Sequence, residues 1–500
     1  MLYKSPMLRM LMVCILALSL QGLAGCKPGR PQPRLVMLNV FCTLGKDMLQ
    51  PYDESVEYTP NLQRFAEQGV VFDRHMTETG QSGVAFASIM SGEHAMRHLV
   101  YSHPTRLADE VQTLPEAFAE AGYDTFFWEA QSMASLKLNY GQGVPPTQAF
   151  HRRQLRADDP QFQAILQRLE DDPNYKAFIL SFYSLTHNLY SRATVGRFCA
   201  EHTSHCEGID PGTAAPLYRD GRRMTYNFPS AVEKYDLKDE RLQELVDAVE
   251  MIYKSRVYYT DAVFGRLVKA VDDHGLGQQS LIAFTTDHGE TLYREDSLFK
   301  WSHSFDLAHE VMNVPLILRG PGIAPGRYTG VSSSADVFPT LAGLSRVPIQ
   351  KGQATFGSDL AKTLDDKQPS KRVVFSHTGL WPPVKKRWWM GQSHFLKFHP
   401  SYDPSAIWAS ARADDLIVKY RYDGAGHFVY EAFDLATDPK ETRNIFDPEN
   451  PSQKELVEQL DRYRKTLIES HVDPRKKPPK GSQPDEDTLM KQLRALGYID

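Results

Sequence analysis

Short apolar segments that alternate with helical patterns are the feature that most constrains the fold of this 500-residue chain. Leu35–Phe41, Ala177–Tyr183 and Ser280–Thr286 are apolar runs of strand length, and segments with helical periodicity separate them. Alternation of this kind is typical of a mostly parallel sheet that is covered by helices on both faces. The sequence therefore predicts an α/β fold with a large, mostly parallel central sheet.

The ends of two of these strands carry the most informative residues. Ser280–Thr286 is followed directly by Asp287 and His288, and open α/β sheets bind their ligands at the carboxyl ends of the strands. A carboxylate beside an imidazole suits a divalent metal or a proton transfer. Leu35–Phe41 ends in Cys42, at a position where such a site would use a carboxylate. We expect Cys42, Asp287 and His288 to belong to one site.

Two further segments place polar residues near helix and strand ends. Thr59–Gly69 has the pattern of a capped helix, with Pro in its first turn and Gly at its end. Ser82 falls where the next helix begins, so that backbone N–H groups and the helix dipole would hold an anion beside its hydroxyl. His187 lies in the loop after Ala177–Tyr183. A long helix is expected over Leu242–Asp273.

The last third of the chain has a different pattern. Val373–Ser376, Leu416–Tyr420 and Val429–Phe433 have the pattern of antiparallel strands, and Ser452–Ser470 has that of a closing helix. We expect a smaller antiparallel sheet at the C-terminal end.

Composition and charge exclude several classes of protein. The chain is 41% hydrophobic and 24% charged, which is ordinary globular material and neither disordered nor fibrous. Its formal net charge is -5, so no excess of positive charge prepares the surface for nucleic acid. The basic clusters Lys385–Arg387 and Arg475–Lys477 are too short to change this. Nucleic acid is therefore not an expected partner.

The amino terminus has the pattern of an export signal. The apolar run Met10–Leu20 is about half of the ~20 residues that a membrane-spanning helix needs, so a secretory signal fits better. Leu23–Cys26 resembles the bacterial lipobox, which implies cleavage before Cys26 and acylation of its thiol. We expect a signal peptide over residues 1–25, a stiff tether over 26–33 and a body that is lipid-anchored to a bacterial membrane, facing the periplasm or the exterior. An uncleaved short anchor is the alternative.

Two of the remaining cysteines lie close together in the sequence. Cys199 and Cys206 are seven residues apart, and in an oxidising compartment a small disulfide loop is favoured over a metal site built with His202 and His205.

The order of these elements resembles the sulfatase family of the alkaline phosphatase superfamily across nearly the whole mature chain. The resemblance implies an α/β sandwich with a large central sheet, a smaller C-terminal sheet, and hydrolysis of sulfate or phosphate esters at a divalent metal, usually calcium. We expect the catalytic domain over residues 34–365 and the C-terminal subdomain over 366–500. Seven segments carry the resemblance in the family's order: Thr59–Ala66, Ala87–Gly92, Thr286–Glu290, Asn313–Gly322, Ala335–Leu341, Phe433–Pro439 with Glu441 and Asn444, and Leu496–Tyr498.

The resemblance assigns roles to several of the residues already named. Asp287 and His288 match the family's second pair of metal ligands. Ser82 matches the nucleophile, a Cys or Ser that a dedicated enzyme converts to formylglycine. Val84–Phe86 stands where the family has Pro, Ser and Arg, which argues against that conversion. An unmodified Ser82 would act as an alkoxide if a metal lowered its pKa.

Two histidines complete the set of catalytic candidates. His187 sits where the family places an imidazole that binds the ester or protonates the leaving group. His303 lies near the position of a Lys or His that contacts the sulfate oxygens, with an ordinary packed or surface histidine as the alternative reading. Phe126–Glu129 stands where the family has a further Lys.

Cys42 is the largest departure from the family pattern. It replaces the first metal-binding Asp, and Thr43 stands where many members have a second one. Calcium prefers hard oxygen ligands and gains little from a thiol. Two outcomes remain open: a softer ion such as zinc held by Cys42, Asp287 and His288, or a site that binds no metal.

Three functions follow from these observations. The first is a lipid-anchored, sulfatase-like hydrolase of sulfate or phosphate esters. The second is a catalytically degenerate lipoprotein that uses the same site to bind an anionic ligand of the cell envelope. The third is a phosphoryl-group transferase that acts on envelope glycans or lipids. The identity of the substrate is not readable from the sequence.

Overall fold

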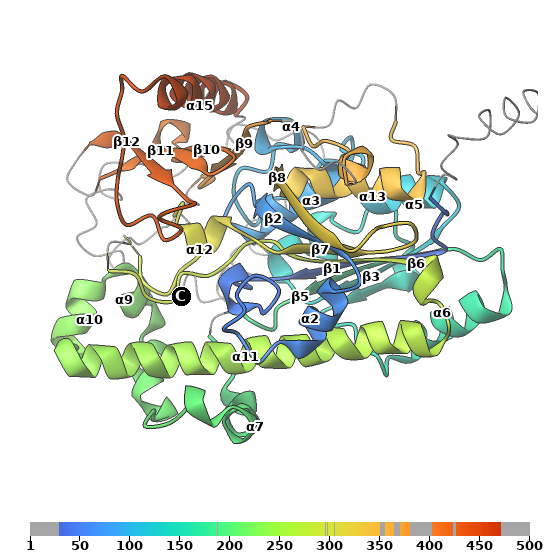
Figure 1. Cartoon of the computed structure of the whole chain (residues 1–500), viewed down its shortest axis with the longest axis horizontal. Coiled ribbons are helices and arrows are strands. Elements are labelled where there is room, and N and C mark those ends of the chain that lie inside the picture. The colour runs from blue at the N-terminus through green and yellow to red at the C-terminus, as the bar shows by residue number, and fades with distance from the viewer. Residues whose placement is uncertain are drawn as a thin grey trace, which may run out of the picture.

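Two sheets organise the chain. The structure is a computed structural model that describes residues 30–187, 189–295, 297, 299–304, 306–350, 356–364, 371–380, 403–423 and 427–471. Within these residues, helices cover both faces of a large sheet, and a smaller sheet lies beside it under one long helix (Figure 1). This architecture confirms the predicted α/β fold with a large central sheet and a smaller C-terminal one.

The large sheet is mostly parallel, as predicted. Its central strand β1 runs parallel to β5 and to β6, and Phe41 is level with Tyr183 and Thr286. β7 differs, because it runs antiparallel to its neighbours β6 and β2. In the described residues the order along the sheet is β4 (Ala149–His151), β3 (Asp124–Glu129), β5 (Ala177–Tyr183), β1 (Leu35–Phe41), β6 (Ser280–Thr286), β7 (Leu316–Arg319), β2 (Val70–Met76) and β8 (Gly326–Ser333).

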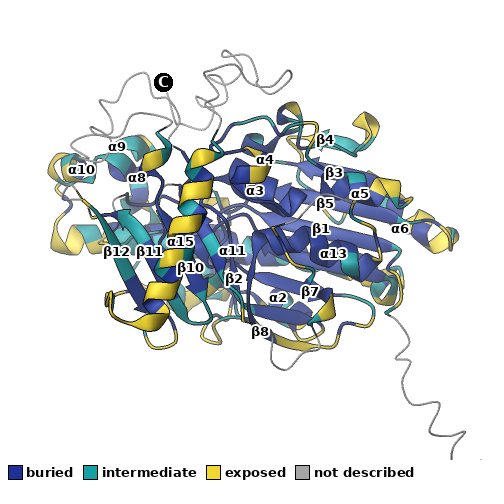
Figure 2. Ribbon diagram, turned by 90° about the horizontal axis from the view of Figure 1, so that it is seen from above, coloured by how far each residue is buried: buried dark blue, intermediate teal, exposed yellow. Residues whose placement is uncertain are grey.

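The central strands are largely apolar because both faces of the sheet are covered. Alternate residues of β1 point to opposite faces: Leu35 and Met37 join the core on one face, and Val36 and Leu38 join the core on the other. All seven residues of β1, of β5 and of β6 are buried, as the dark ribbons in Figure 2 show. Strands buried on both faces need continuous apolar sequence, which is why they were readable.

Different helices cover the two faces. Side chains of α2, α6 and α11 share one core with the sheet, and those of α3, α5 and α13 share the other. α11 begins three residues before the predicted start and runs along the sheet (Figure 1). The described helices are α2 (Pro60–Ala66), α3 (Ser82–Ser91), α4 (Ala95–His98), α5 (Leu114–Glu120), α6 (Pro160–Asp171), α7 (Val195–Glu201), α8 (Ala215–Arg219), α9 (Gly221–Tyr226), α10 (Phe228–Tyr235), α11 (Asp239–Asp273), α12 (His309–Met312), α13 (Val337–Ser345) and α15 (Pro451–Glu469).

The small sheet is antiparallel and packs against α15. Leu456 and Leu460 of α15 share a core with small residues of the sheet such as Ala411. The helix was expected one residue later at each end. One strand, β10, was not predicted. The order among the described residues is β12 (Phe428–Asp434), β11 (Leu416–Tyr422), β10 (Ala409–Ala413) and β9 (Val374–His377).

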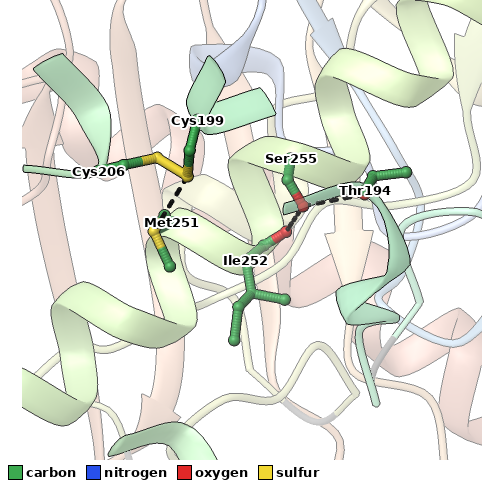
Figure 3. Close-up of a disulfide and its surroundings, with 6 residues drawn as sticks. All are labelled: Thr194, Cys199, Cys206, Met251, Ile252 and Ser255. Atoms are coloured by element: carbon green, nitrogen blue, oxygen red, sulfur yellow. Dashed lines mark hydrogen bonds between the residues drawn. A yellow bond between two sulfur atoms is a disulfide. The ribbon is translucent and has the colours of Figure 1, made fainter. Parts of the chain in front are cut away.

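A disulfide closes a short loop within the segment between β5 and α11. Cys199 and Cys206 are bonded, and the sulfur of Cys199 lies 3.8 Å from that of Met251 on α11 (Figure 3). The rings of His202 and His205 pack against Phe198 instead of converging on an ion. The expected disulfide is therefore present.

Several predicted features lie outside the described residues. These include the signal peptide, Cys26 and the first part of the tether, the two basic clusters at Lys385–Arg387 and Arg475–Lys477, and the final motif Leu496–Tyr498. Among the helices that are described, none combines the length and the apolar character needed to cross a membrane.

Candidate active site

Three buried side chains meet where β1 and β6 end. Cys42 follows β1, and Asp287 and His288 follow β6. Phe41 and Thr286 are level in adjacent parallel strands. The residues that follow them, Cys42 and Asp287, are therefore neighbours. One potential ligand atom from each of the three residues lies within 4.8 Å of the others. The structure thus brings together the three residues that the sequence assigned to a metal.

Asp287 has one satisfied and one unsatisfied carboxylate oxygen. Oδ1 accepts the backbone N–H groups of Thr43, at 3.2 Å, and of His288, at 2.7 Å. Oδ2 is buried, has no hydrogen-bond partner among the described residues, and lies 3.4 Å from Nε2 of His288. A buried carboxylate oxygen without a partner is rare, and a cation or a proton would satisfy it.

His288 turns one nitrogen to the backbone and the other to the site. Its Nδ1 lies 2.9 Å from the carbonyl oxygen of Gly289, and only a protonated nitrogen can pair with a carbonyl. Nε2 then carries the lone pair and accepts the hydroxyl of Ser82 at 3.1 Å. Histidines that bind metals are held in this way, by an N–H that donates to a carbonyl.

Ser82 begins α3 and is almost fully buried. Its hydroxyl lies between the Nε2 of His288 and the sulfur of Cys42, which is 3.4 Å away. The first N–H groups of a helix have no partner within the helix, so its start favours a negatively charged ligand. A hydroxyl at a helix start, beside a lone pair and an unsatisfied carboxylate, is a suitable position for a nucleophile.

Cys42 is fixed by a residue that the sequence analysis did not identify. Gln131, which lies two residues beyond β3, donates its amide N–H to the sulfur at 3.0 Å. The N–H of Met133 donates to the other end of the amide at 3.3 Å, which orients it. Burial and the charge of Asp287 raise the pKa of the Cys42 thiol well above its usual value. Without a bound cation, the thiol therefore keeps its proton.

The two predicted histidines lie next to this centre. The ring of His303 stacks on that of His288 with centroids 4.6 Å apart, and the ring of His187 lies 5.1 Å from that of His303. Nδ1 of His303 is 3.3 Å from both carboxylate oxygens of Glu290, and burial raises the pKa of Glu290 to about 7. Glu290 belongs to the segment Thr286–Glu290 that resembles the family, but the sequence predicted no role for it.

His103 is a fourth imidazole that sequence reasoning missed. Its Cβ lies close enough to Gly83 that a side chain there would clash with it. Burial lowers the pKa of His103 to about 3, and His303 and His288 add to the effect. Its neighbours come from distant segments, so no local pattern in the sequence pointed to it.

Two departures from the family pattern have simple structural consequences. Phe86 packs in the core with its ring stacked 4.3 Å from that of Phe182, so it does not reach the site. Thr43 donates its hydroxyl to the carbonyl of Cys42 at 2.7 Å and offers no side-chain ligand.

The donor atoms fit a soft divalent ion better than calcium. Calcium takes six to eight oxygen ligands, and this centre offers one carboxylate. A sulfur, a carboxylate oxygen and an imidazole nitrogen are a ligand set that zinc accepts, with a fourth position left for substrate or water. Cys42, Asp287 and His288 would hold such an ion.

Comparison with known proteins agrees with this arrangement. The sequence pattern of the family described as Sulfatase matches residues 43–347, which is more than half of the chain. The chain belongs to the sulfatase family.

Individual relatives of this chain are distant in sequence. It is 23% identical over 364 residues to the choline-sulfatase of Rhizobium meliloti, covering 64% of this chain and 69% of the relative. It is 23% identical over 455 residues to the delta 4,5-hexuronate-2-O-sulfatase of Bacteroides thetaiotaomicron, covering 85% and 87%. It matches only 33% to 38% of the arylsulfatase K chains.

A solved structure shows the same fold. The phosphonate monoester hydrolase of Agrobacterium radiobacter superimposes with a TM-score of 0.59 at 18% identity, covering 91% of this chain and all of that one.

Proposed function

We propose that this protein hydrolyses sulfate or phosphate esters, with Ser82 as the nucleophile. The observation that carries the proposal is the position of the Ser82 hydroxyl, 3.1 Å from Nε2 of His288 at the start of α3. Membership of the sulfatase family supports the reaction class, because family members are known hydrolases of such esters. The proposal concerns the class of ester and not the alcohol that carries it.

The side chains divide the reaction between them. The hydroxyl of Ser82 gives its proton to Nε2 of His288, which lies 3.1 Å away, as its oxygen attacks the sulfur or phosphorus atom. The bond from that atom to the ester oxygen breaks, and the ester oxygen leaves with a proton from His187. His303 contacts the oxygens of the transferred group, together with the N–H groups at the start of α3. Water then releases that group from Ser82.

A divalent ion would strengthen this site. Held by Cys42, Asp287 and His288, it would lower the pKa of the Ser82 hydroxyl and draw charge from the ester oxygens. The unsatisfied Oδ2 of Asp287 and the raised pKa of Cys42 support such an ion, because a cation would relieve both.

Turnover of a panel of aryl sulfates and aryl phosphates tests the proposal. The wild type, Ser82→Ala and the exposed control Ser55→Ala would be compared after loading with zinc or with calcium. We expect kcat to fall at least about 1,000-fold in Ser82→Ala and to stay unchanged in Ser55→Ala. Absence of turnover with either metal, or equal rates in all three proteins, would overturn the proposal.

A second function is favoured by one observation. Phe86 replaces the Arg that the family places beside the nucleophile, and its ring is committed to the core. A site without that Arg would bind an anionic envelope ligand without converting it. Binding of inorganic sulfate to wild-type protein that shows no turnover would favour this alternative.

We also propose that the protein is exported and lipid-anchored through Cys26. The disulfide between Cys199 and Cys206 supports an oxidising compartment. Mass analysis of the amino-terminal peptide tests the anchor: an acylated Cys26 is expected, and an unmodified one would contradict it.

A further inference from the structure

Glu290 lies directly behind His303. Its side chain is fully buried, that of His303 is almost so, and both carboxylate oxygens are 3.3 Å from Nδ1 of the ring. Nε2, on the opposite side of the ring, is buried and has no hydrogen-bond partner among the described residues. One nitrogen of this ring is therefore held, and the other is left for a ligand.

The backbone fixes this pairing. Thr291 and Ser302 form an antiparallel bridge, in which the N–H of Thr291 donates to the carbonyl of Ser302 at 3.2 Å. In an antiparallel bridge the preceding residue on one side faces the following residue on the other, so Glu290 is set opposite His303. The contact is thus a consequence of the register and not of a mobile surface loop.

One face of the His303 ring lies against the ring of His288 at the centre of the site. The two rings stack at an interplanar angle of 20°. The backbone of Gly80, two residues before Ser82, approaches the carbonyl oxygen of His303 so closely that a Cβ on Gly80 would lie 1.9 Å from it. His303 is therefore held between the segment that carries the nucleophile and Glu290.

We infer that Glu290 is a positioning residue, which accepts the Nδ1–H of His303 and so presents Nε2 of that ring to the oxygens of the transferred sulfuryl or phosphoryl group. This inference rests on the proposed function. A lysine ammonium at this position would offer three donors and would need no such partner. An imidazole has two nitrogens in one plane, and a partner on one of them decides which nitrogen meets the ligand.

Two substitutions separate this role from simple packing. Glu290→Gln keeps a carbonyl oxygen that can accept the Nδ1–H, and Glu290→Ala removes it. We expect kcat to stay within about threefold of wild type in Glu290→Gln and to fall about 10- to 100-fold in Glu290→Ala. The exposed Glu295, in the same loop, provides the control Glu295→Ala. Equal losses of kcat in Glu290→Gln and Glu290→Ala would overturn the inference.

A second readout does not depend on turnover. In protein with 15N-labelled histidine, the signals of His303 are identified by their loss in His303→Gln. We expect the proton on Nδ1 in the wild type and in Glu290→Gln, and a shift of the proton toward Nε2 in Glu290→Ala. An unchanged His303 spectrum in Glu290→Ala would overturn the inference. If no protein turns over ester but the spectra change as expected, the proposed function fails and the contact between Glu290 and His303 stands.

Discussion

Cys42 decides which ion the site can accept. The residue directly follows β1, at the position that the resemblance assigns to a metal-binding Asp, and its sulfur lies beside Asp287 and His288. Sulfur is a soft ligand that suits zinc, whereas calcium is held by oxygen atoms. At the scale of one side chain, we expect this exchange of ligand to favour a softer ion at the same place.

Restoring a carboxylate at this position should reverse the preference. We expect Cys42→Asp to bind calcium at least about tenfold more tightly than the wild type and zinc at least about tenfold more weakly. Calorimetric titration of each metal into metal-free protein measures both changes. The matched variant Cys42→Ser removes the thiol without adding a charge, so zinc affinity should fall and calcium affinity should not rise. Stronger zinc binding by Cys42→Ser would contradict the role of the sulfur.

Sequence reasoning at this scale found residues at strand ends and missed those brought in by tertiary contacts. Asp287 and His288 were visible because they follow an apolar strand directly. Gln131 also follows a strand, after one intervening residue, but a neutral amide in a loop is not by itself typical of a metal or catalytic site. Glu290 was visible only as part of a motif, because its partner His303 is set by the bridge between Thr291 and Ser302.

At the scale of elements, the loop before α3 and the segment that carries His303 are pressed together. Gly80 makes this possible, since a Cβ there would meet the carbonyl oxygen of His303 at 1.9 Å. Neither backbone can move aside without displacing Ser82 or His303. A glycine at position 80 therefore allows the segments that carry Ser82 and His303 to approach each other closely.

Gly80→Ala should uncouple the two elements. We expect kcat to fall at least about tenfold, since small misplacements of reacting groups have large effects on rate. Gly196→Ala is the matched control, because nothing lies within 4 Å of a Cβ built at this helical position, and it should leave kcat unchanged. Steady-state kinetics, with circular dichroism to check folding, measures the effect. Wild-type kcat in Gly80→Ala would show that the close approach does not position the site.

The elements that were predicted are those whose local pattern agreed with their burial. The strands β1, β5 and β6 are largely apolar and fully buried, and they were placed correctly. β10 was missed because Ala409–Ala413 contains small residues and an Arg instead of the branched and aromatic residues typical of strands. The antiparallel direction of β7 could not be predicted either, since an apolar run does not indicate whether a strand is parallel or antiparallel to its neighbours.

At the scale of the whole molecule, a buried polar cluster joins the two sheets. Glu78, which follows β2, accepts from Nε2 of His377 on β9 at 2.9 Å and lies 3.4 Å from Nε2 of His98. Nδ1 of each histidine accepts a backbone N–H, from Gly379 at 2.8 Å and from Val100 at 3.1 Å. Each Nε2 therefore carries a proton and donates, so this cluster is a structural contact and not a second metal site.

The cluster makes stability depend on pH. Burial lowers the pKa of His94 to about 4, although Glu78 opposes the shift. Above its ordinary pKa of 6.5, His94 is neutral in both the folded and the unfolded chain. Between pH 6.5 and 4 only the unfolded chain takes up the proton, so stability is lost as the pH falls. We expect the free energy of unfolding to fall by up to about 2 kcal/mol between pH 7 and pH 5 from this group alone.

Urea unfolding at pH 7 and pH 5 measures this loss. Glu78 does not reverse the direction of this change in stability. Burial raises the pKa of Glu78, but His94 and His377 outweigh burial and hold that pKa below its ordinary value. Its contribution is therefore lost only on stronger acidification. His94→Asn should lose less stability than the wild type over the interval, and the control His427→Asn, at an exposed histidine, should match the wild type. The same loss in His94→Asn as in wild type would contradict the assignment.

The division of the chain into units rests on the same physical reasoning. The large sheet follows from its buried strands, and the small sheet follows from the antiparallel pattern past residue 365. Contacts between the two sheets join residues that are far apart in the sequence. Glu78 and His377, for example, are 299 residues apart. No local sequence pattern predicts such a contact.

The metal content of the full-length protein tests the central claim most directly. After dialysis against equal concentrations of zinc and calcium, followed by removal of loosely bound ions, elemental analysis would count the ions held per chain. We expect one zinc and no calcium in the wild type, because Cys42, Asp287 and His288 supply sulfur, oxygen and nitrogen from one buried centre. A chain that retains no ion, or that holds zinc equally well after Asp287→Ala, would contradict the account.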